Sequence, residues 1–100
     1  MVEIKAAKHK GGLYALSVRG HAAGSVPVCA AISTVTQALA GYLTRHQTER
    51  FDIEELTLRG GEAEIRFRSK DPAAADAVWE MSAGMLQWLA RRNPEYIRVL

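Results

Sequence analysis

The spacing of apolar residues along this sequence changes from every second position to every third or fourth, and it does so twice. Alternation of apolar and polar side chains is typical of a strand with one wet face, whereas the longer spacing is typical of a helix packed on one side. Each alternating segment contains a glycine pair, which predicts a hairpin, and a short apolar segment closes the chain. The expected order is ββαββαβ, with strands within residues 2–20, 50–70 and 94–100 and helices at residues 27–45 and 71–92.

The polar faces of the expected strands indicate how the layers stack. Each strand has one apolar face and one face of charged or hydroxyl side chains, so both helices should cover the same side of the sheet. In the second hairpin, Leu56 and Leu58 should face the same way as Ile65. The pair Glu54-Glu55 interrupts the alternation, which predicts either a bulge or a strand that begins only there. The predicted fold class is α/β of the α+β type, a two-layer sandwich with a mainly antiparallel sheet and two helices on one face.

An apolar stripe on each expected helix predicts its buried face. The second helix should open with Asp71 as its cap and Pro72 at the first helical position. Gly84 lowers the stability of this helix relative to alanine, and the close approach of another helix would explain why a glycine stands there. The residues expected to be buried are Val28, Ile32, Val35, Leu39 and Tyr42 in the first helix and Ala75, Val78, Trp79, Ser82, Met85, Leu86 and Leu89 in the second.

Composition narrows the class of protein. With 100 residues and 48% hydrophobic residues, the chain can build one core, so we expect a single domain over residues 1–100. The net charge is +2 and charges of both signs are interspersed. No apolar run approaches the roughly 20 residues that cross a bilayer, so we expect no membrane partner and a cytoplasmic location. One cysteine and three dispersed histidines lack the spacing of a zinc site, so we expect no metal.

The single cysteine, Cys29, falls outside the apolar stripe and in the first turn of the first helix. His21 precedes it by eight positions, at the end of the second expected strand. The first N–H groups of a helix have no intrahelical partner, and with the helix dipole they favour a thiolate. The same groups would stabilise the oxyanion formed when a thiolate attacks a peptide carbonyl. Ser33 lies on the cysteine face of the helix, where a low, partly polar strip would accept an extended peptide.

Two other interpretations fit parts of the sequence. A free cysteine often packs as a small hydrophobe, so Cys29 is either such a residue or an activated nucleophile. The basic segment "RFRSK" at residues 66–70 suggests an RNA-binding or ribosome-binding module. Alternation, however, places Phe67 inside and its arginine neighbours outside, which leaves no exposed aromatic platform. We therefore expect no specific nucleic-acid partner.

The residues around the cysteine resemble the ribosomal-processing cysteine protease (Prp) family of bacteria. The matching segments are "RGHA" at residues 19–22 and "VCAAIS" at residues 28–33, and the order of elements agrees over essentially all 100 residues. Members of this family are small cytosolic enzymes that trim the N-terminal extension from a large-subunit ribosomal protein. The resemblance therefore implies a cysteine endopeptidase.

The resemblance also implies roles for individual residues. Cys29 would be the nucleophile, and His21 the base that activates it and later protonates the leaving amine. Gly20 would let the backbone turn sharply before His21, while Ala22 and Ser33 would support the site or bind substrate. The resemblance further implies a homodimer, an extended peptide substrate cleaved after an aromatic residue, and no cofactor.

The segment between the histidine and the cysteine departs from the family. Its members usually have a longer, glycine-containing loop with an aspartate shortly before the cysteine. Here the loop is "AGSVP", and no acidic residue lies between His21 and Cys29. Three possibilities stay open: a dyad that works without the aspartate, a carboxylate supplied from elsewhere, or a diverged relative that binds a peptide or the ribosome without cleaving it.

Overall fold

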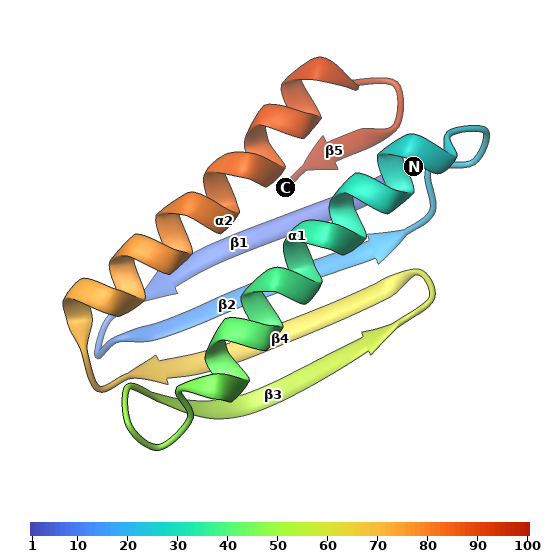
Figure 1. Ribbon diagram of the computed structural model, residues 1–100. Coiled ribbons are helices and arrows are strands. Elements are labelled where there is room, and N and C mark those ends of the chain that lie inside the picture. The colour runs from blue at the N-terminus through green and yellow to red at the C-terminus, as the bar shows by residue number, and fades with distance from the viewer.

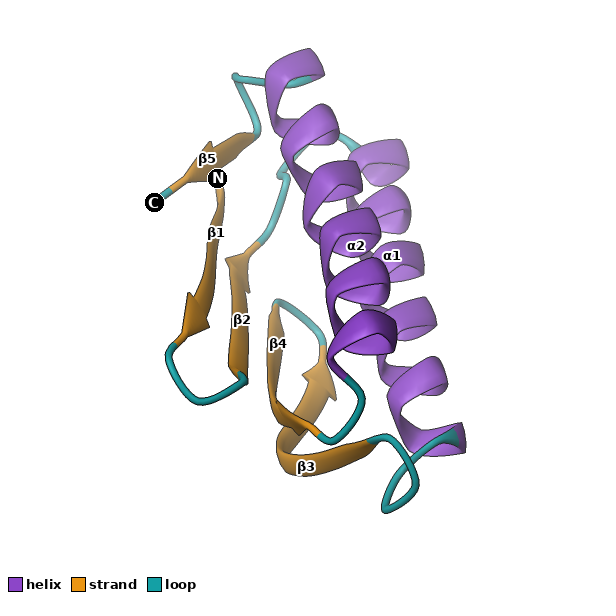
Figure 2. Cartoon of the chain, turned by 90° about the vertical axis from the view of Figure 1, so that its left-hand side faces the viewer, coloured by secondary structure: helices purple, strands orange, loops and turns teal.

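The computed structural model describes residues 1–100 and places both helices on one face of a five-stranded sheet (Figure 1). Figure 2 shows the two layers edge on, with the opposite face of the sheet left open. The sheet order is β3-β4-β2-β1-β5, antiparallel throughout except for the parallel pair β1 and β5. The predicted element order and fold class are confirmed. The elements are β1 (Val2–His9), β2 (Leu13–Gly20), α1 (Val26–Arg45), β3 (Phe51–Arg59), β4 (Glu62–Ser69), α2 (Pro72–Arg92) and β5 (Ile97–Val99).

Short polar side chains set the starts of both helices. The Asp71 carboxylate accepts a hydrogen bond from the N–H of Ala74 at 3.2 Å, which confirms the predicted cap of α2. Ser25 caps α1 in the same way through the N–H of Val28, at 3.3 Å. The first helix therefore begins at Val26, one residue earlier than predicted.

The buried face of α1 follows the predicted stripe over its first three turns. From Leu39 the stripe continues by a step of four to Leu43, which is 0% exposed. The predicted place of Tyr42 in this stripe is wrong, because its side chain is only half-buried at the edge of the core. Thr36 is also buried, where its hydroxyl donates to the carbonyl of Ile32 at 3.2 Å. A helix interior thus accommodates a polar side chain that bonds its own backbone.

The buried face of α2 is narrower than predicted. The buried residues of this helix are spaced four, three and four positions apart. Met85 lies beside that stripe, with 39% of its surface exposed. The prediction that Met85 is buried is therefore wrong. No other part of this chain approaches α2 closely at Gly84, because no heavy atom lies within 4 Å of the point where a Cβ would stand, so the predicted close helix approach does not occur within the chain. The buried residues of α2 are Ala75, Trp79, Ser82 and Leu86.

The second hairpin contains the predicted bulge. The register between β3 and β4 shifts between Ile53 and Glu55, after which Leu56 lies opposite Ile65, as alternation requires. Leu56 and Leu58 nevertheless remain 39% and 40% exposed. They lie in the second half of β3, an edge strand of the sheet, toward the turn to β4.

Charged and aromatic contacts join the first turns of α2 to the first hairpin. The Tyr14 ring stacks on Phe67 with centroids 4.9 Å apart and meets the edge of Trp79 at 5.4 Å. The Tyr14 hydroxyl donates to the Asp76 carboxylate, which also pairs with the Lys8 ammonium at 2.6 Å. These hydrogen bonds, from Lys8 and then from Tyr14, lower the pKa of Asp76.

Helix α1 passes the length and hydropathy criteria for a membrane span, with a mean hydropathy of 1.4, contrary to our expectation that no segment would. A core helix can meet the same criteria, since both kinds of helix are long and apolar. The buried residues of α1 lie against the sheet (Figure 2).

Candidate active site

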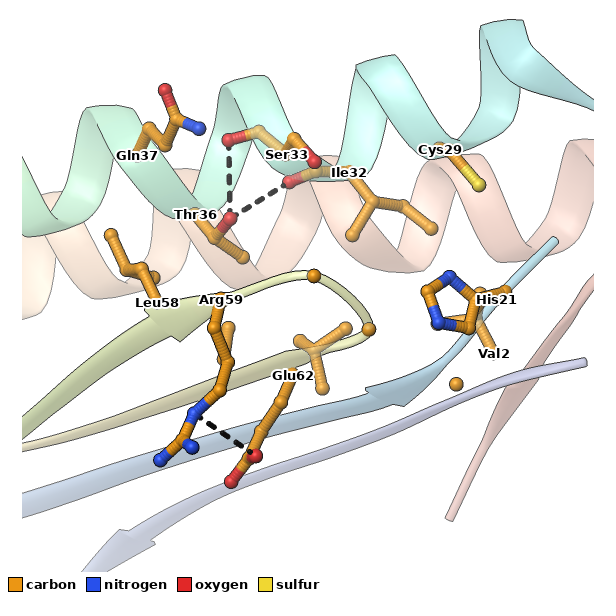
Figure 3. A pocket seen from close by; sticks show the side chains of 15 residues that line it. Val2, His21, Cys29, Ile32, Ser33, Thr36, Gln37, Leu58, Arg59 and Glu62 are labelled. Carbon is orange, nitrogen blue, oxygen red and sulfur yellow. Dashed lines mark hydrogen bonds and ion pairs between the residues drawn. The ribbon is translucent and has the colours of Figure 1, made fainter.

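A groove of about 460 Å³ separates the first half of α1 from the turn that joins β3 and β4 (Figure 3). His21 and Cys29 both line this groove, at the end where β2 gives way to the helix. Ser33 and Gln37 continue the α1 wall away from the cysteine, and Leu58 faces them from β3. The strip beside the cysteine that the sequence predicts is therefore one wall of a groove.

Cys29 is half-buried in the first full turn of α1. Its thiol donates a weak hydrogen bond to the carbonyl of Ala22, with 3.8 Å between sulfur and oxygen. Ala22 is 3% exposed, so this carbonyl belongs to a buried residue of the loop. Cys29 packs partly against the core, yet its sulfur points into the groove on the side of His21 (Figure 3).

Most of the N–H groups at the start of α1 are already used. Pro27 has no N–H, the N–H of Val28 donates to the Ser25 hydroxyl, and that of Cys29 donates to the Ser25 carbonyl at 3.3 Å. Only the N–H of Val26 among these four positions makes no hydrogen bond. The set of free donors predicted for an oxyanion is therefore reduced to one.

His21 leaves the sheet with its backbone held on both sides. Its carbonyl accepts from the amino group of Met1 at 2.8 Å, and the preceding Gly20 donates to the carbonyl of Gly61 at 2.9 Å. The φ of Gly20 is +102°, a conformation that favours glycine. The imidazole makes no hydrogen bond or ion pair, and none joins it to Cys29. The structure therefore brings the two side chains to one groove without connecting them.

One carboxylate lines the groove. Glu62, the first residue of β4, pairs with Arg59 across the turn, with 3.5 Å between nitrogen and oxygen. Both side chains point away from His21 (Figure 3). No carboxylate from another part of the chain thus takes the place beside the imidazole that an aspartate in the loop would occupy.

Gly61 is a neighbour of the His21 ring that the sequence did not suggest. The glycine pair at residues 60 and 61 predicts only a turn, and nothing local indicates that this turn meets His21, 40 positions earlier. The contact arises because β4 pairs with β2, and the register places Arg19 opposite Glu62 at the end of the ladder. No group of three or more metal-binding side chains occurs in the structure.

Comparison with known proteins agrees with this geometry. The family described as cysteine protease Prp matches residues 1–98. The essential ribosomal processing protease Prp from S. aureus, solved with a covalently linked product peptide, is similar with a TM-score of 0.71 and 24% identity, over 99% of this chain and 97% of that one. The same enzyme solved with a substrate peptide has a TM-score of 0.71 and 22% identity, over 100% of this chain and 98% of that one. SMU.848 from Streptococcus mutans has a TM-score of 0.68 and 20% identity, over 99% of this chain and 91% of that one.

No curated protein matches the sequence. The solved structures share the fold, whereas the family match extends over nearly the whole chain and includes both His21 and Cys29. On that match, together with the groove that holds its cysteine and histidine, the chain belongs to the cysteine protease Prp family.

Proposed function

We propose that this protein is a cysteine endopeptidase in which Cys29 is the nucleophile and His21 the general base. The observation that carries the proposal is that both side chains open into one end of the same groove of about 460 Å³. The groove offers hydroxyl and amide groups along α1 and an apolar side chain from β3, a mixture suited to peptide backbone and side chains.

In the proposed reaction, His21 takes the proton of the Cys29 thiol, and the sulfur attacks the scissile carbonyl carbon. The C–N bond then breaks as the imidazolium returns its proton to the leaving amine, which leaves a thioester on Cys29. His21 next takes a proton from water, and the resulting hydroxide hydrolyses the thioester.

The proposed substrate is the N-terminal extension of a large-subunit ribosomal protein. The S. aureus enzyme of the same family is described as a ribosomal processing protease and has been solved with substrate and product peptides. Ribosomal proteins are made in the cytoplasm, so the proposal requires a cytoplasmic enzyme.

The rate of Cys29 alkylation by iodoacetamide, measured from pH 5 to pH 9, tests the dyad. The His21→Ala variant should react at least tenfold more slowly than wild type near neutral pH, because the thiol loses its base. His9→Ala is the matched control, since His9 is exposed and lies at the far end of β1. Identical profiles for wild type and His21→Ala would eliminate His21 as the base.

Incubation with the precursor of the ribosomal protein from the same organism tests the substrate. Wild type should cleave the precursor, Cys29→Ser should not, and His21→Ala should cleave it about 100-fold to 10,000-fold more slowly. Binding of the precursor without cleavage by wild type would favour the second candidate, a diverged relative that only binds peptides. The observation that favours this candidate is the missing carboxylate beside His21.

The proposal includes a homodimer that forms through the outer face of α2. Met81, Met85 and Trp88 are 67%, 39% and 49% exposed on this face, an unusual cluster for a helix turned to water. Gly84 lies among them with open space above it. A second copy approaching closely at this point would explain the glycine that the fold of one chain does not require.

A further inference from the structure

We propose that Gly61, in the turn between β3 and β4, is a positioning residue that holds the His21 imidazole in its working orientation. This inference rests on the proposed function, since it takes His21 as the base. Gly61 touches neither the sulfur nor the scissile bond; it acts through the histidine.

The His21 ring lies where a side chain at position 61 would stand. A Cβ at this position would lie 2.4 Å from Nε2 and 2.8 Å from Cε1 of His21, far closer than carbon and nitrogen atoms approach in real structures. The imidazole edge therefore occupies the volume that any other residue would fill with its side chain. The neighbouring Gly60 differs, because nothing lies within 4 Å of its Cβ position. Gly61 therefore contacts the ring, whereas Gly60 faces open space. We call the surface of Gly61 that contacts the ring the seat.

The backbone ties this seat to the histidine. Gly20 donates to the carbonyl of Gly61 at 2.9 Å, immediately beyond the last register pair of β2 and β4. The turn is thus bonded to the residue that precedes His21, which holds Gly61 beside the backbone that carries the ring. The φ of Gly61 is +74°, which further favours glycine there.

The seat matters because no polar partner orients the ring. The His21 imidazole has no hydrogen bond, and the Glu62 carboxylate points away from it (Figure 3). Because Nε2 faces the turn, Nδ1 is the ring nitrogen on the side of α1 and Cys29 (Figure 3). Packing against Gly61 therefore restricts the orientation of the exposed ring and keeps Nδ1 on the side of the nucleophile, without the hydrogen bond by which a carboxylate also selects the tautomer.

The variant Gly61→Ala tests the proposal. Its methyl group should displace the imidazole, lower kcat for the precursor at least tenfold with a smaller change in KM, and shift the alkylation profile of Cys29 toward that of His21→Ala. Added to His21→Ala, the substitution should have no further effect on alkylation. Gly11→Ala is the control for backbone strain, because Gly11 has φ +81° in the hairpin turn at the opposite end of the sheet. Gly60→Ala is the control for space and should keep the wild-type alkylation profile.

An NMR measurement separates this inference from the proposed chemistry. The ring protons of His21 should show nuclear Overhauser contacts to the Hα protons of Gly61 in wild type, and the Cε1–H signal should move in Gly61→Ala but not in Gly60→Ala. Absence of the contacts in wild type would overturn the proposal even if the variant did not fold. An effect of His21→Ala on alkylation without one of Gly61→Ala would overturn the seat alone, whereas no effect of His21→Ala would overturn the dyad itself.

Discussion

At the scale of single residues, glycine lets two parts of the backbone meet beside the groove. A Cβ on Gly20 would collide with the carbonyl oxygen of Met1, the residue that precedes the neighbouring strand β1. The resemblance of "RGHA" to a protease family suggests a glycine before His21, and the structure supplies a reason for it: the chain passes here where no side chain fits.

We expect Gly20→Ala to lower the free energy of unfolding by about 2 kcal/mol, because it adds both a clash and a positive-φ alanine. Urea unfolding followed by circular dichroism would measure the change. Gly24→Ala is the matched control, since Gly24 has φ +88° with nothing within 4 Å of its Cβ position. Gly24→Ala should show only the strain of an alanine at positive φ, and therefore a smaller loss of unfolding free energy than Gly20→Ala. Equal losses for the two variants would mean that the clash with Met1 contributes nothing.

At the scale of elements, the Asp76 cluster fixes the first turns of α2 to the first hairpin. The carboxylate accepts from both Tyr14 and Lys8, which lowers its pKa below the value of about 3.9 found in unfolded chains. A lowered pKa in the folded state means that the carboxylate stabilises the fold above the unfolded pKa. This stabilisation is lost as the pH falls through the folded pKa.

We accordingly expect Asp76→Asn to lower Tm at pH 7, and the difference from wild type to shrink as the pH falls below about 4. Thermal unfolding from pH 2 to pH 7 would measure both effects. Asp52→Asn is the control, since Asp52 pairs with Lys70 at 3.2 Å on the exposed surface and such pairs contribute little. A Tm difference that persisted unchanged to pH 2 would contradict the assignment.

The elements were largely predictable because their signals are local. The alternation in the hairpins, the Asp71 cap and the interruption at Glu54 each act within a few residues, and the structure confirms them. The exposure of Leu56 and Met85 was not predictable in the same way. Periodicity tells which face a side chain occupies, whereas its burial depends on how far another element extends over it.

In the candidate site, too, the features with local signals were predictable and those that depend on the whole fold were not. Cys29 and His21 could be found from the sequence because one loop joins them, and the structure places both in one groove. The contact of Gly61 with His21 could not, because it depends on the pairing of β2 with β4, which follows from the whole sheet rather than from either strand. The hydrogen bonds of Ser25 that use up the N–H groups of α1 depend likewise on where the helix actually begins.

At the scale of the whole molecule, the two outer surfaces differ in chemistry. The open face of the sheet carries ion pairs, such as Arg19 with Glu64 at 2.9 Å. The outer face of α2 carries instead an exposed tryptophan, Trp88, over which the Arg92 guanidinium lies at 4.7 Å from the ring centroid. A second copy should therefore bind through α2 and leave the open face of the sheet in water.

We expect wild type to sediment at equilibrium with twice the mass of the 11.0 kDa chain, and Trp88→Glu to shift the protein toward the monomer. A charge placed in the centre of an apolar contact loses its hydration without gaining a partner. Lys5→Gln, on the open face, lowers the net charge by the same one unit and should leave the dimer intact. A wild-type monomer at every concentration tested would exclude the proposed assembly.

On the proposed role of Gly61, the pairing of β2 with β4 would make activity depend on how much of the chain has been synthesised. A ribosome releases a chain in order, so His21 and Cys29 emerge well before the turn at Gly61. On the proposed mechanism, a half-made chain holds its nucleophile and its base but lacks the surface that orients the base, until the second hairpin docks against the first. If Gly61 positions His21 as proposed, the protein would therefore become active only after its second hairpin has been made and has docked.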